Sequence, residues 1–177
     1  MTDSDLIRRV VDTDDHAAFG ELVGRHQSSV RHFLRHLTGG DAGLADDLAQ
    51  DTFVQAYRGL GRFGGGSSFS TWLLGIAQNL WRNHRRKAHT VPLEPGHLEQ
   101  LESAPSPAAG DLRQDLNQAL RQLSKDEQTA IHLSYQQGLS HGEIAALVGW
   151  PLGTVKTHLN RAKDKLRPLL ASWNPQT

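Results

Sequence analysis

The sequence predicts an all-α protein in which two small helical domains are joined by a flexible linker. Apolar residues recur three and four positions apart over most of the 177-residue chain, as they do on one face of an α-helix. This pattern stops between residues 88 and 110, where four prolines interrupt any helix. No segment of useful length alternates apolar and polar residues as a half-buried strand would.

The first domain is placed at residues 1–90 and begins with two long apolar stripes. These stripes run through residues 19–37 and 44–60, and a pair of glycines separates them. Asp41 follows the glycine pair and is a plausible N-cap for the second helix, because its carboxylate can accept hydrogen bonds from free backbone N–H groups.

A further helix is predicted after residues 64–68, a glycine- and serine-rich segment that is typical of a loop. Its apolar residues run from Phe69 to Leu80, and its end carries a basic cluster without any acid: Arg82, Arg85, Arg86 and Lys87. A small polar loop beside aromatic residues can receive an unstacked base. A plain flexible connector explains the same loop equally well.

The linker is placed at residues 91–110, where prolines and small residues accompany three acidic residues and no Lys or Arg. The second domain, residues 111–177, is expected to be a helix-turn-helix domain. Two predicted capping boxes, Ser124 with Glu127 and Ser140 with Glu143, start two of its helices.

The turn of the helix-turn-helix is expected at Gly149, because glycine takes a positive φ at no steric cost. The helix that follows has a predicted buried stripe of Leu152, Val155, Leu159, Ala162 and Leu166. Residues 151–171 carry five Lys or Arg side chains and one acid. Since the second helix of this motif enters the major groove, DNA binding is favoured over a merely solvated basic helix.

The net charge is zero, with 19 basic and 19 acidic residues, but the charges are segregated along the chain. The two basic clusters suggest two sites of phosphate contact. The absence of cysteine excludes disulfides, thiol catalysis and cysteine-ligated zinc. No apolar run approaches the roughly 20 residues of a membrane helix, and the N-terminus lacks a signal-peptide core. A cytoplasmic protein without membrane insertion is therefore expected.

Two groups of side chains have the spacing of a catalytic or metal site. Asp46, Asp47 and Asp51 share one predicted helix but have no nucleophile beside them, so a solvated face or a docking surface is favoured over acid–base chemistry. His32 and His36 lie four residues apart but lack an HExxH pattern, so packing or exposed histidines are favoured over metal ligands. We expect no catalytic residue, no metal and no cofactor.

The chain resembles the extracytoplasmic-function (ECF, group IV) sigma factors of bacterial RNA polymerase. The resemblance extends from about residue 15 to residue 171 and rests on three motifs in the right order and spacing: DLAQDTFVQAYRGLGRF, FSTWLLGIAQNLWRNHRRK and LSHGEIAALVGWPLGTVKTHLNRAKDKL. It implies sigma region 2 in the first domain, sigma region 4 in the second, and a connector that threads the polymerase between them.

The resemblance implies a role for each motif. The first motif would bind the β′ clamp helices of the polymerase through Asp47, Gln50, Asp51 and Phe53. The loop and the helix after it would recognise and open the −10 element. The residues implied in that role are Ser67, Ser68, Phe69, Trp72, Asn79, Arg82, Asn83 and Arg86. The last helix would read the −35 element through Lys156, Thr157, Asn160, Arg161 and Lys163. Lys163, Lys165 and Arg167 are also expected at phosphate or at the β flap.

The implied function is that of a sigma factor, a dissociable subunit that directs core RNA polymerase to promoter DNA and helps to melt it. Such a protein is not an enzyme, and the resemblance also implies an anti-sigma partner. His158 and Asn160 depart from residues that are often found in the family, so no promoter sequence is transferred. Two rival functions are a stand-alone helix-turn-helix regulator, which leaves the Trp-rich basic helix unexplained, and a helical metalloenzyme, which the scattered histidine spacing disfavours.

Overall fold

The computed structural model describes residues 1–90 and 119–171. These residues form helices and turns and contain no strand, which confirms the predicted all-α class. They fall into two compact units, one within residues 1–103 and the other within residues 104–177. The predicted linker at residues 91–110 lies outside the described residues.

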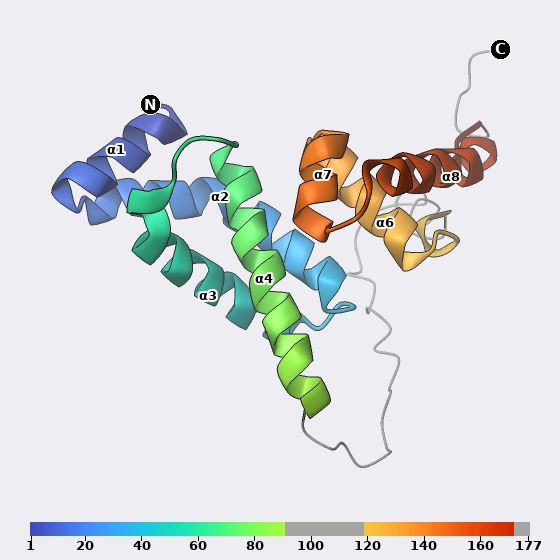
Figure 1. Cartoon of the computed structure of the whole chain (residues 1–177), viewed down its shortest axis with the longest axis horizontal. Helices are drawn as coiled ribbons and strands as arrows, with labels where there is room; N and C mark the ends of the chain where they lie inside the picture. Colours follow the sequence, from blue (N-terminus) through green and yellow to red (C-terminus); the bar gives the residue numbers. More distant parts are fainter. Residues whose placement is uncertain (91–118, 172–177) are drawn as a thin grey trace, which may run out of the picture. The chain divides into compact units, whose positions relative to one another are not determined.

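In the described part of the first unit, helices α1, α2, α3 and α4 follow one another along the chain (Figure 1), and the short 3₁₀ turn η1 lies between α3 and α4. Helix α2 packs against α1, α3 and α4, and α3 also packs against α4. Their bounds are α1 Asp3–Thr13, α2 His16–Leu37, α3 Ala42–Gly59, η1 Leu60–Arg62 and α4 Phe69–Thr90.

Side-chain caps determine where the helices of the first unit begin. Asp15 Oδ1 accepts a hydrogen bond from Ala18 N at 2.9 Å, and Asp41 Oδ1 accepts one from Leu44 N at 3.0 Å, so the predicted Asp41 cap is confirmed. Such caps satisfy backbone N–H groups that the first helical turn leaves free. Asp14 joins α1 to α2 in the left-handed region, with φ 52°.

The apolar stripes of the first unit meet in one core. Leu22, Phe33 and Leu34 of α2 are fully buried, as are Leu73 and Leu74 of α4. The other buried core residues are Leu6, Val10, Ala18, Val30, Ala45, Leu48, Ala49, Ala56, Leu60, Phe69 and Ala77. Most of these residues belong to the predicted stripes, whereas Leu6 and Val10 lie on α1, a helix that the stripes did not predict.

The second unit contains α6, a π-helical turn, α7 and α8, with residues 119–121 helical before them. Both predicted capping boxes are present, at Ser124–Glu127 and at Ser140–Glu143, and Gly149 has the predicted positive φ of 78°. Helices α6 and α7 pack against α8. The bounds are α6 Lys125–Ile131, η2 His132–Gln136, α7 His141–Val148 and α8 Leu152–Ala171.

The buried stripe of α8 is shorter than predicted. Val155, Leu159, Ala162 and Leu166 are buried as expected, but Leu152 is 46% exposed. Leu152 is the first residue of α8, and the buried face begins one position of the stripe later, at Val155. The periodicity alone does not show where along a helix the packing begins, because that depends on the neighbouring helices.

Candidate functional site

A cleft with a volume of about 690 Å³ lies between α2 and α3. Apolar, aromatic, polar and charged side chains line it. The apolar and aromatic lining residues are Phe19, Val23, Ala49, Phe53, Val54 and Tyr57. Asp47, Gln50 and Phe53, three of the four residues predicted to bind polymerase, line this cleft. Asp51 is exposed on α3 but is not part of the lining.

The acidic residues of the cleft differ in their partners. Asp46 Oδ1 lies 3.4 Å from Arg31 Nε across the cleft, so this carboxylate is already paired. Asp47 and Asp51 are exposed and have no ion pair within residues 1–90 and 119–171. Two free carboxylates beside an apolar surface can bind a partner that presents basic residues around an apolar contact.

Tyr57 fixes one end of the cleft. Its hydroxyl donates to Asp14 Oδ1, its ring stacks on His16 with centroids 5.8 Å apart, and Phe19 meets it edge to face at 4.9 Å. The hydrogen bond to the Asp14 carboxylate, with burial, raises the pKa of Tyr57, because both disfavour the phenolate. Phe19 and Tyr57 belong to the apolar stripes of the sequence, and an aromatic residue in a stripe has the same pattern whether it lines a core or a cleft. Their place in the cleft therefore cannot be predicted from the sequence.

The glycine- and serine-rich loop ends in the N-cap of α4. Ser68 Oγ accepts a hydrogen bond from Thr71 N at 3.0 Å, and Ser68 O accepts one from Trp72 N at 3.0 Å. Ser67 is exposed, and Gly65 adopts a φ of 70° that favours glycine. Of the two serines predicted to contact DNA, Ser68 therefore also starts the helix.

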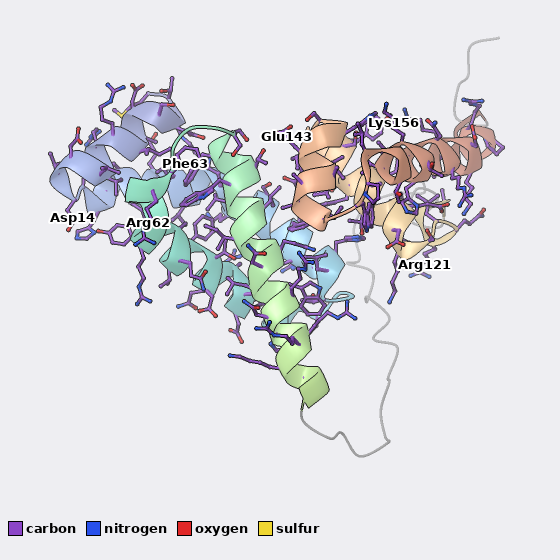
Figure 2. All side chains as sticks on the ribbon, in the orientation of Figure 1. Asp14, Arg62, Phe63, Arg121, Glu143 and Lys156 are labelled. Atoms are coloured by element: carbon purple, nitrogen blue, oxygen red, sulfur yellow. The ribbon has the colours of Figure 1, made fainter. Side chains whose placement is uncertain are left out.

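Three aromatic rings pack together at the base of this loop. Phe63 lies in the segment between η1 and α4 (Figure 2), and its centroid is 5.1 Å from that of Trp72 and 5.8 Å from that of Phe69. Trp72 is half-buried, whereas Phe69 is only 4% exposed. Phe69 therefore supports the cluster from the core side, and of the two predicted base-contacting rings only Trp72 is accessible.

The C-terminal part of α4 carries polar side chains on one face. Asn79, Asn83 and Arg86 are spaced by four and three residues, so they share a face, and Arg82 lies beside it; all four are exposed. Arg86 Nη2 lies 3.4 Å from Asn83 Oδ1. Because α4 contains no acidic residue, this face offers only amides and cations, which suits phosphate and base edges.

The exposed face of α8 carries most of the residues predicted for duplex DNA. Lys156, which Figure 2 labels on α8, is exposed, as are Thr157, Asn160 and Arg161. They lie away from the buried stripe of the helix. Lys and Arg can donate to guanine and Asn can bond adenine bidentately. The Thr157 hydroxyl donates to Gly153 O at 2.9 Å, which leaves its lone pairs as acceptors.

Two lysines of α8 have partners within the unit. Lys163 Nζ lies 5.8 Å from the ring centroid of Tyr135, and Tyr135 is 62% exposed. Lys165 Nζ lies 2.7 Å from Oε2 of Glu127, which is only 4% exposed. Lys165 therefore holds α8 to α6. The sequence does not predict this ion pair, because Lys165 has the same pattern there as the other cations of the basic helix.

His158 and Asn160, the two residues of α8 that depart from those often found in the family, lie in different environments. Asn160 is exposed among the predicted base-reading residues. His158 is half-buried against Trp150, with ring centroids 4.9 Å apart, and its Nδ1 has no hydrogen-bond partner within the described residues. His158 therefore packs on the inner side of α8, whereas the residues predicted to read bases are exposed.

Within residues 1–90 and 119–171, no group of three or more His, Asp or Glu side chains is arranged to hold a metal ion. No helix in the part of the chain that the structure describes is long and apolar enough to cross a membrane.

The chain matches two family models in order along the sequence: Sigma-70 region 2 over residues 22–90, and Sigma-70, region 4 over residues 113–166. It is 34% identical to the RNA polymerase sigma-H factor of Pseudomonas aeruginosa, covering 95% of each chain. It is 33% identical to the ECF RNA polymerase sigma-E factor of Escherichia coli K12, covering 96% of this chain and 97% of that one.

A solved structure of the sigma factor RpoE with the anti-sigma factor NepR from Bartonella quintana is also similar. Its sigma factor is 29% identical, with a TM-score of 0.62 over 86% of this chain and 96% of that one. Relatives of this kind are transcription initiation factors and not enzymes. On this likeness over nearly the whole length, the chain belongs to the ECF group of the sigma-70 family of RNA polymerase sigma factors.

Proposed function

We propose that this protein binds core RNA polymerase, directs it to promoters with −35 and −10 elements, and helps to open the −10 region. Residues 1–90 would act as sigma region 2, residues 91–110 as the linker, and residues 111–177 as sigma region 4. The observation that carries the proposal is that one chain holds an apolar cleft bordered by exposed carboxylates and, in a separate unit, a basic helix on which the residues predicted to read bases are exposed.

The cleft between α2 and α3 is the proposed site for the β′ clamp helices. A helix that lies in the cleft would bury Phe53 among the aromatic and apolar residues around it. Asp47 and Asp51 would pair with basic residues of that helix, and the Gln50 amide would add hydrogen bonds. Asp51 is not part of the cleft lining, so it would contact the partner from the rim of the cleft.

The loop at residues 64–68 and the exposed face of α4 are the proposed −10 site. Ser67 and the accessible part of Trp72 would line the pocket for a flipped base, while Ser68 and Phe69 would hold the loop and the ring cluster in place. Asn79, Arg82, Asn83 and Arg86 would follow the single strand along the helix. Stacking and cationic contacts of this kind are how proteins hold unpaired DNA.

Helix α8 is the proposed reader of the −35 element. Lys156, Thr157, Asn160 and Arg161 would contact base edges or phosphates in the major groove. Lys163 lies beside the exposed Tyr135, so we assign this pair to a phosphate or to the β flap rather than to a base. Arg167 is exposed and remains a candidate for the same contacts, whereas Lys165 is held by Glu127.

An anti-sigma factor is a further proposed partner. The related RpoE was solved with the anti-sigma factor NepR, and a cleft that binds polymerase is also a site where a competitor would block it. Since the proposed partners are polymerase and promoter DNA, we place the action of the protein in the cytoplasm.

The proposal is tested by mixing the purified chain with core RNA polymerase and mapping the transcripts that the mixture starts on genomic DNA. We expect starts at a defined set of positions that share two upstream elements, and none with core polymerase alone. Starts that match those of core polymerase alone would overturn the proposed function.

A further inference from the structure

The first turn of α1 is connected to the base of the proposed −10 loop by a chain of side-chain contacts. Asp3 lies in the first turn of α1, His26 in the middle of α2, and Phe69 at the start of α4. These three residues are far apart in the sequence, and nothing in the proposed roles of α3, α4 and α8 requires them to meet.

His26 stands between the other two residues. Its Nε2–H donates to Asp3 Oδ2 over 2.7 Å, and its ring meets the Phe69 ring edge to face, with centroids 5.3 Å apart at 76°. The His26 side chain is only 15% exposed. The His26 ring is therefore held by the hydrogen bond to Asp3 on one side and by contact with the Phe69 ring on the other.

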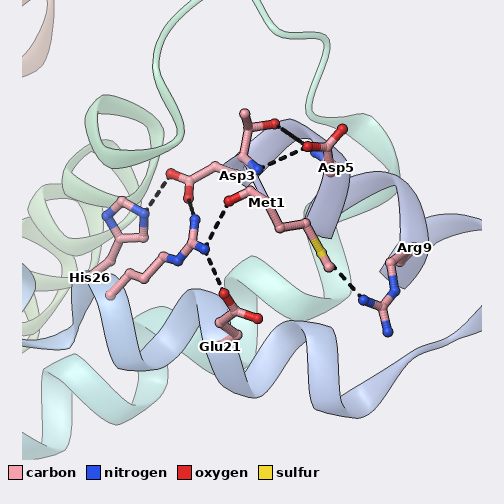
Figure 3. A network of polar contacts seen from close by, with 8 residues as sticks. Met1, Asp3, Asp5, Arg9, Glu21 and His26 are labelled. Atoms are coloured by element: carbon pink, nitrogen blue, oxygen red, sulfur yellow. Dashed lines mark hydrogen bonds and ion pairs between the residues drawn. The ribbon is translucent and has the colours of Figure 1, made fainter.

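Asp3 is itself held in place. Its other oxygen, Oδ1, accepts a hydrogen bond from Arg25 Nη1 at 3.0 Å, and Arg25 also pairs with Glu21 at 2.5 Å (Figure 3). The carboxylate is thus fixed by donors from two successive residues of α2. Its place in the first turn of α1 also suits a negative charge at the positive end of a helix dipole.

Phe69 connects His26 to the two ends of the loop. It packs on Phe63, which precedes the loop, and on Trp72, which follows it, with centroids 5.8 Å apart in both cases. A rotation of Phe69 would therefore displace both ends of the segment that receives the base. Binding sites keep their geometry when supporting side chains are locked by packing and by hydrogen bonds of their own.

We propose that His26, held by Asp3, is a positioning residue for strand opening: it fixes Phe69 and so preforms the aromatic base of the −10 pocket. The pair touches no DNA in this role. The inference rests on the proposed function, because it requires that the loop and α4 open the promoter. It predicts a defect confined to the opening step, with polymerase binding and −35 recognition unchanged.

The test compares two promoter templates with holoenzyme made from core polymerase and the full chain. One template is fully duplex, and the other has a mismatched, already open −10 region. Open complex is measured on both templates as the fraction of bound DNA that resists heparin, because the −10 bases of the mismatched template are unpaired before the protein binds. The variants are His26→Ala and Asp3→Ala, with His26→Gln as the conservative variant, because its side-chain amide can still donate to Asp3.

Asp5→Ala is the matched control. Asp5 shares the first turn of α1 and belongs to the Thr2 capping box, with Oδ2 2.8 Å from Thr2 N. Its replacement therefore loosens the same helix without removing a contact to His26. A defect that came only from a weakened α1 would appear in this variant as strongly as in Asp3→Ala.

On the duplex template we expect His26→Ala and Asp3→Ala to lower the open complex by about tenfold, the ratio for loss of one good hydrogen bond. On the open template both should match the wild type, and Asp5→Ala should be close to wild type on both. His26→Gln keeps a donor to Asp3 but loses the ring contact with Phe69, so it should open the duplex less than wild type and more than His26→Ala. Wild-type opening by His26→Ala on the duplex, or an equal deficit on both templates, would overturn the inference. Failure of the wild-type protein to open the duplex would instead overturn the proposed function.

Discussion

At the scale of single residues, Glu127 joins the start of α6 to the middle of α8. Its Oε2 accepts hydrogen bonds from Ser124 N at 2.9 Å and from Lys165 Nζ at 2.7 Å. Burial alone would raise the pKa of this carboxyl, but the ion pair with Lys165 and the hydrogen bond from Ser124 outweigh burial and hold the pKa below its ordinary value of 4.5.

This lowered pKa predicts how the stability of the chain depends on pH. The pKa of Glu127 is lower in the folded state than in the unfolded state. The carboxylate therefore stabilises the fold fully at pH values above the unfolded-state pKa, and this stabilisation is lost as the pH falls through the folded-state pKa. We expect Glu127→Gln to lower the free energy of unfolding by about 1 kcal/mol at neutral pH. The loss is smaller than for a fully buried ion pair, because Lys165 is half-exposed to solvent. Well below pH 4.5 the variant and wild type should converge.

Urea unfolding followed by circular dichroism at the two pH values measures this difference. Glu143→Gln is the control, because Glu143 occupies the equivalent capping box on α7 and is less buried than Glu127. An identical loss of stability for Glu127→Gln at both pH values would show that the charge of Glu127 does not act as described.

The same ion pair predicts that two lysines of α8 differ in their contribution to DNA binding. Lys156 is exposed and free to displace counterions from phosphate, whereas Lys165 is held by Glu127. The slope of log Kd against log salt reports the number of phosphate contacts. Lys156→Ala should lower that number by about one, and Lys165→Ala should leave the slope unchanged. Binding of holoenzyme to promoter DNA between low and moderate KCl measures both slopes, and equal reductions in the two variants would contradict this assignment.

At the scale of elements, α3 divides its surface between the core and the cleft. Ala45, Leu48, Thr52 and Ala56 are buried, while Asp47 and Gln50 line the cleft. The Thr52 hydroxyl donates to Leu48 O at 2.7 Å, so the one polar side chain on the buried face has a partner. A charge can therefore be changed on the outer face of α3 without disturbing its packing.

Reversing the charge at this cleft should separate polymerase binding from folding. We expect Asp47→Arg to weaken binding to core polymerase by about 2–5 kcal/mol, because like charges would then face each other across the interface. Asp51→Arg should weaken binding less, because Asp51 stands at the rim of the cleft. Gln55→Arg, on an exposed position of the same helix outside the cleft, should bind normally. Fluorescence anisotropy of labelled chain titrated with core polymerase measures all three, and tight binding by Asp47→Arg would remove the cleft from the interface.

At the scale of the whole molecule, the two proposed DNA readers lie in two separate compact units. Each unit alone offers a few base contacts, so each should bind promoter DNA weakly. Binding tightens when polymerase fixes the spacing between them, because the second contact then forms at a high effective concentration.

We therefore expect the free chain to distinguish promoter from random DNA only slightly, and the holoenzyme to prefer promoter DNA by about 10²-fold or more. Competition binding with both DNAs, with and without core polymerase, measures the two ratios. A free chain that bound promoter DNA tightly, and as a dimer, would favour the rival function of a stand-alone helix-turn-helix regulator.

Local signals in the sequence sufficed for much of the fold and for part of the site. Ser140, Glu143 and Gly149 determine the helix-turn-helix boundaries through contacts within a few residues, so they could be recognised without any tertiary information. The exposed residues of α8 could be named for the same reason, because once the buried stripe is known the opposite face follows from helical geometry. Leu152 shows the limit of this reasoning, since its position in the stripe did not make it buried.

Spacing and local hydrogen bonds were therefore enough to predict most of the helices, the caps at Asp41, Ser124 and Ser140, and the family, whereas helix α1 was not predicted. The ion pairs of the cations and the exposure of the aromatic rings depend instead on how the helices pack. Lys165 pairs with Glu127, 38 residues away in the sequence, and Phe69 is buried against His26 of another helix. Such contacts join segments that are distant along the chain, and they exist only once the helices have packed.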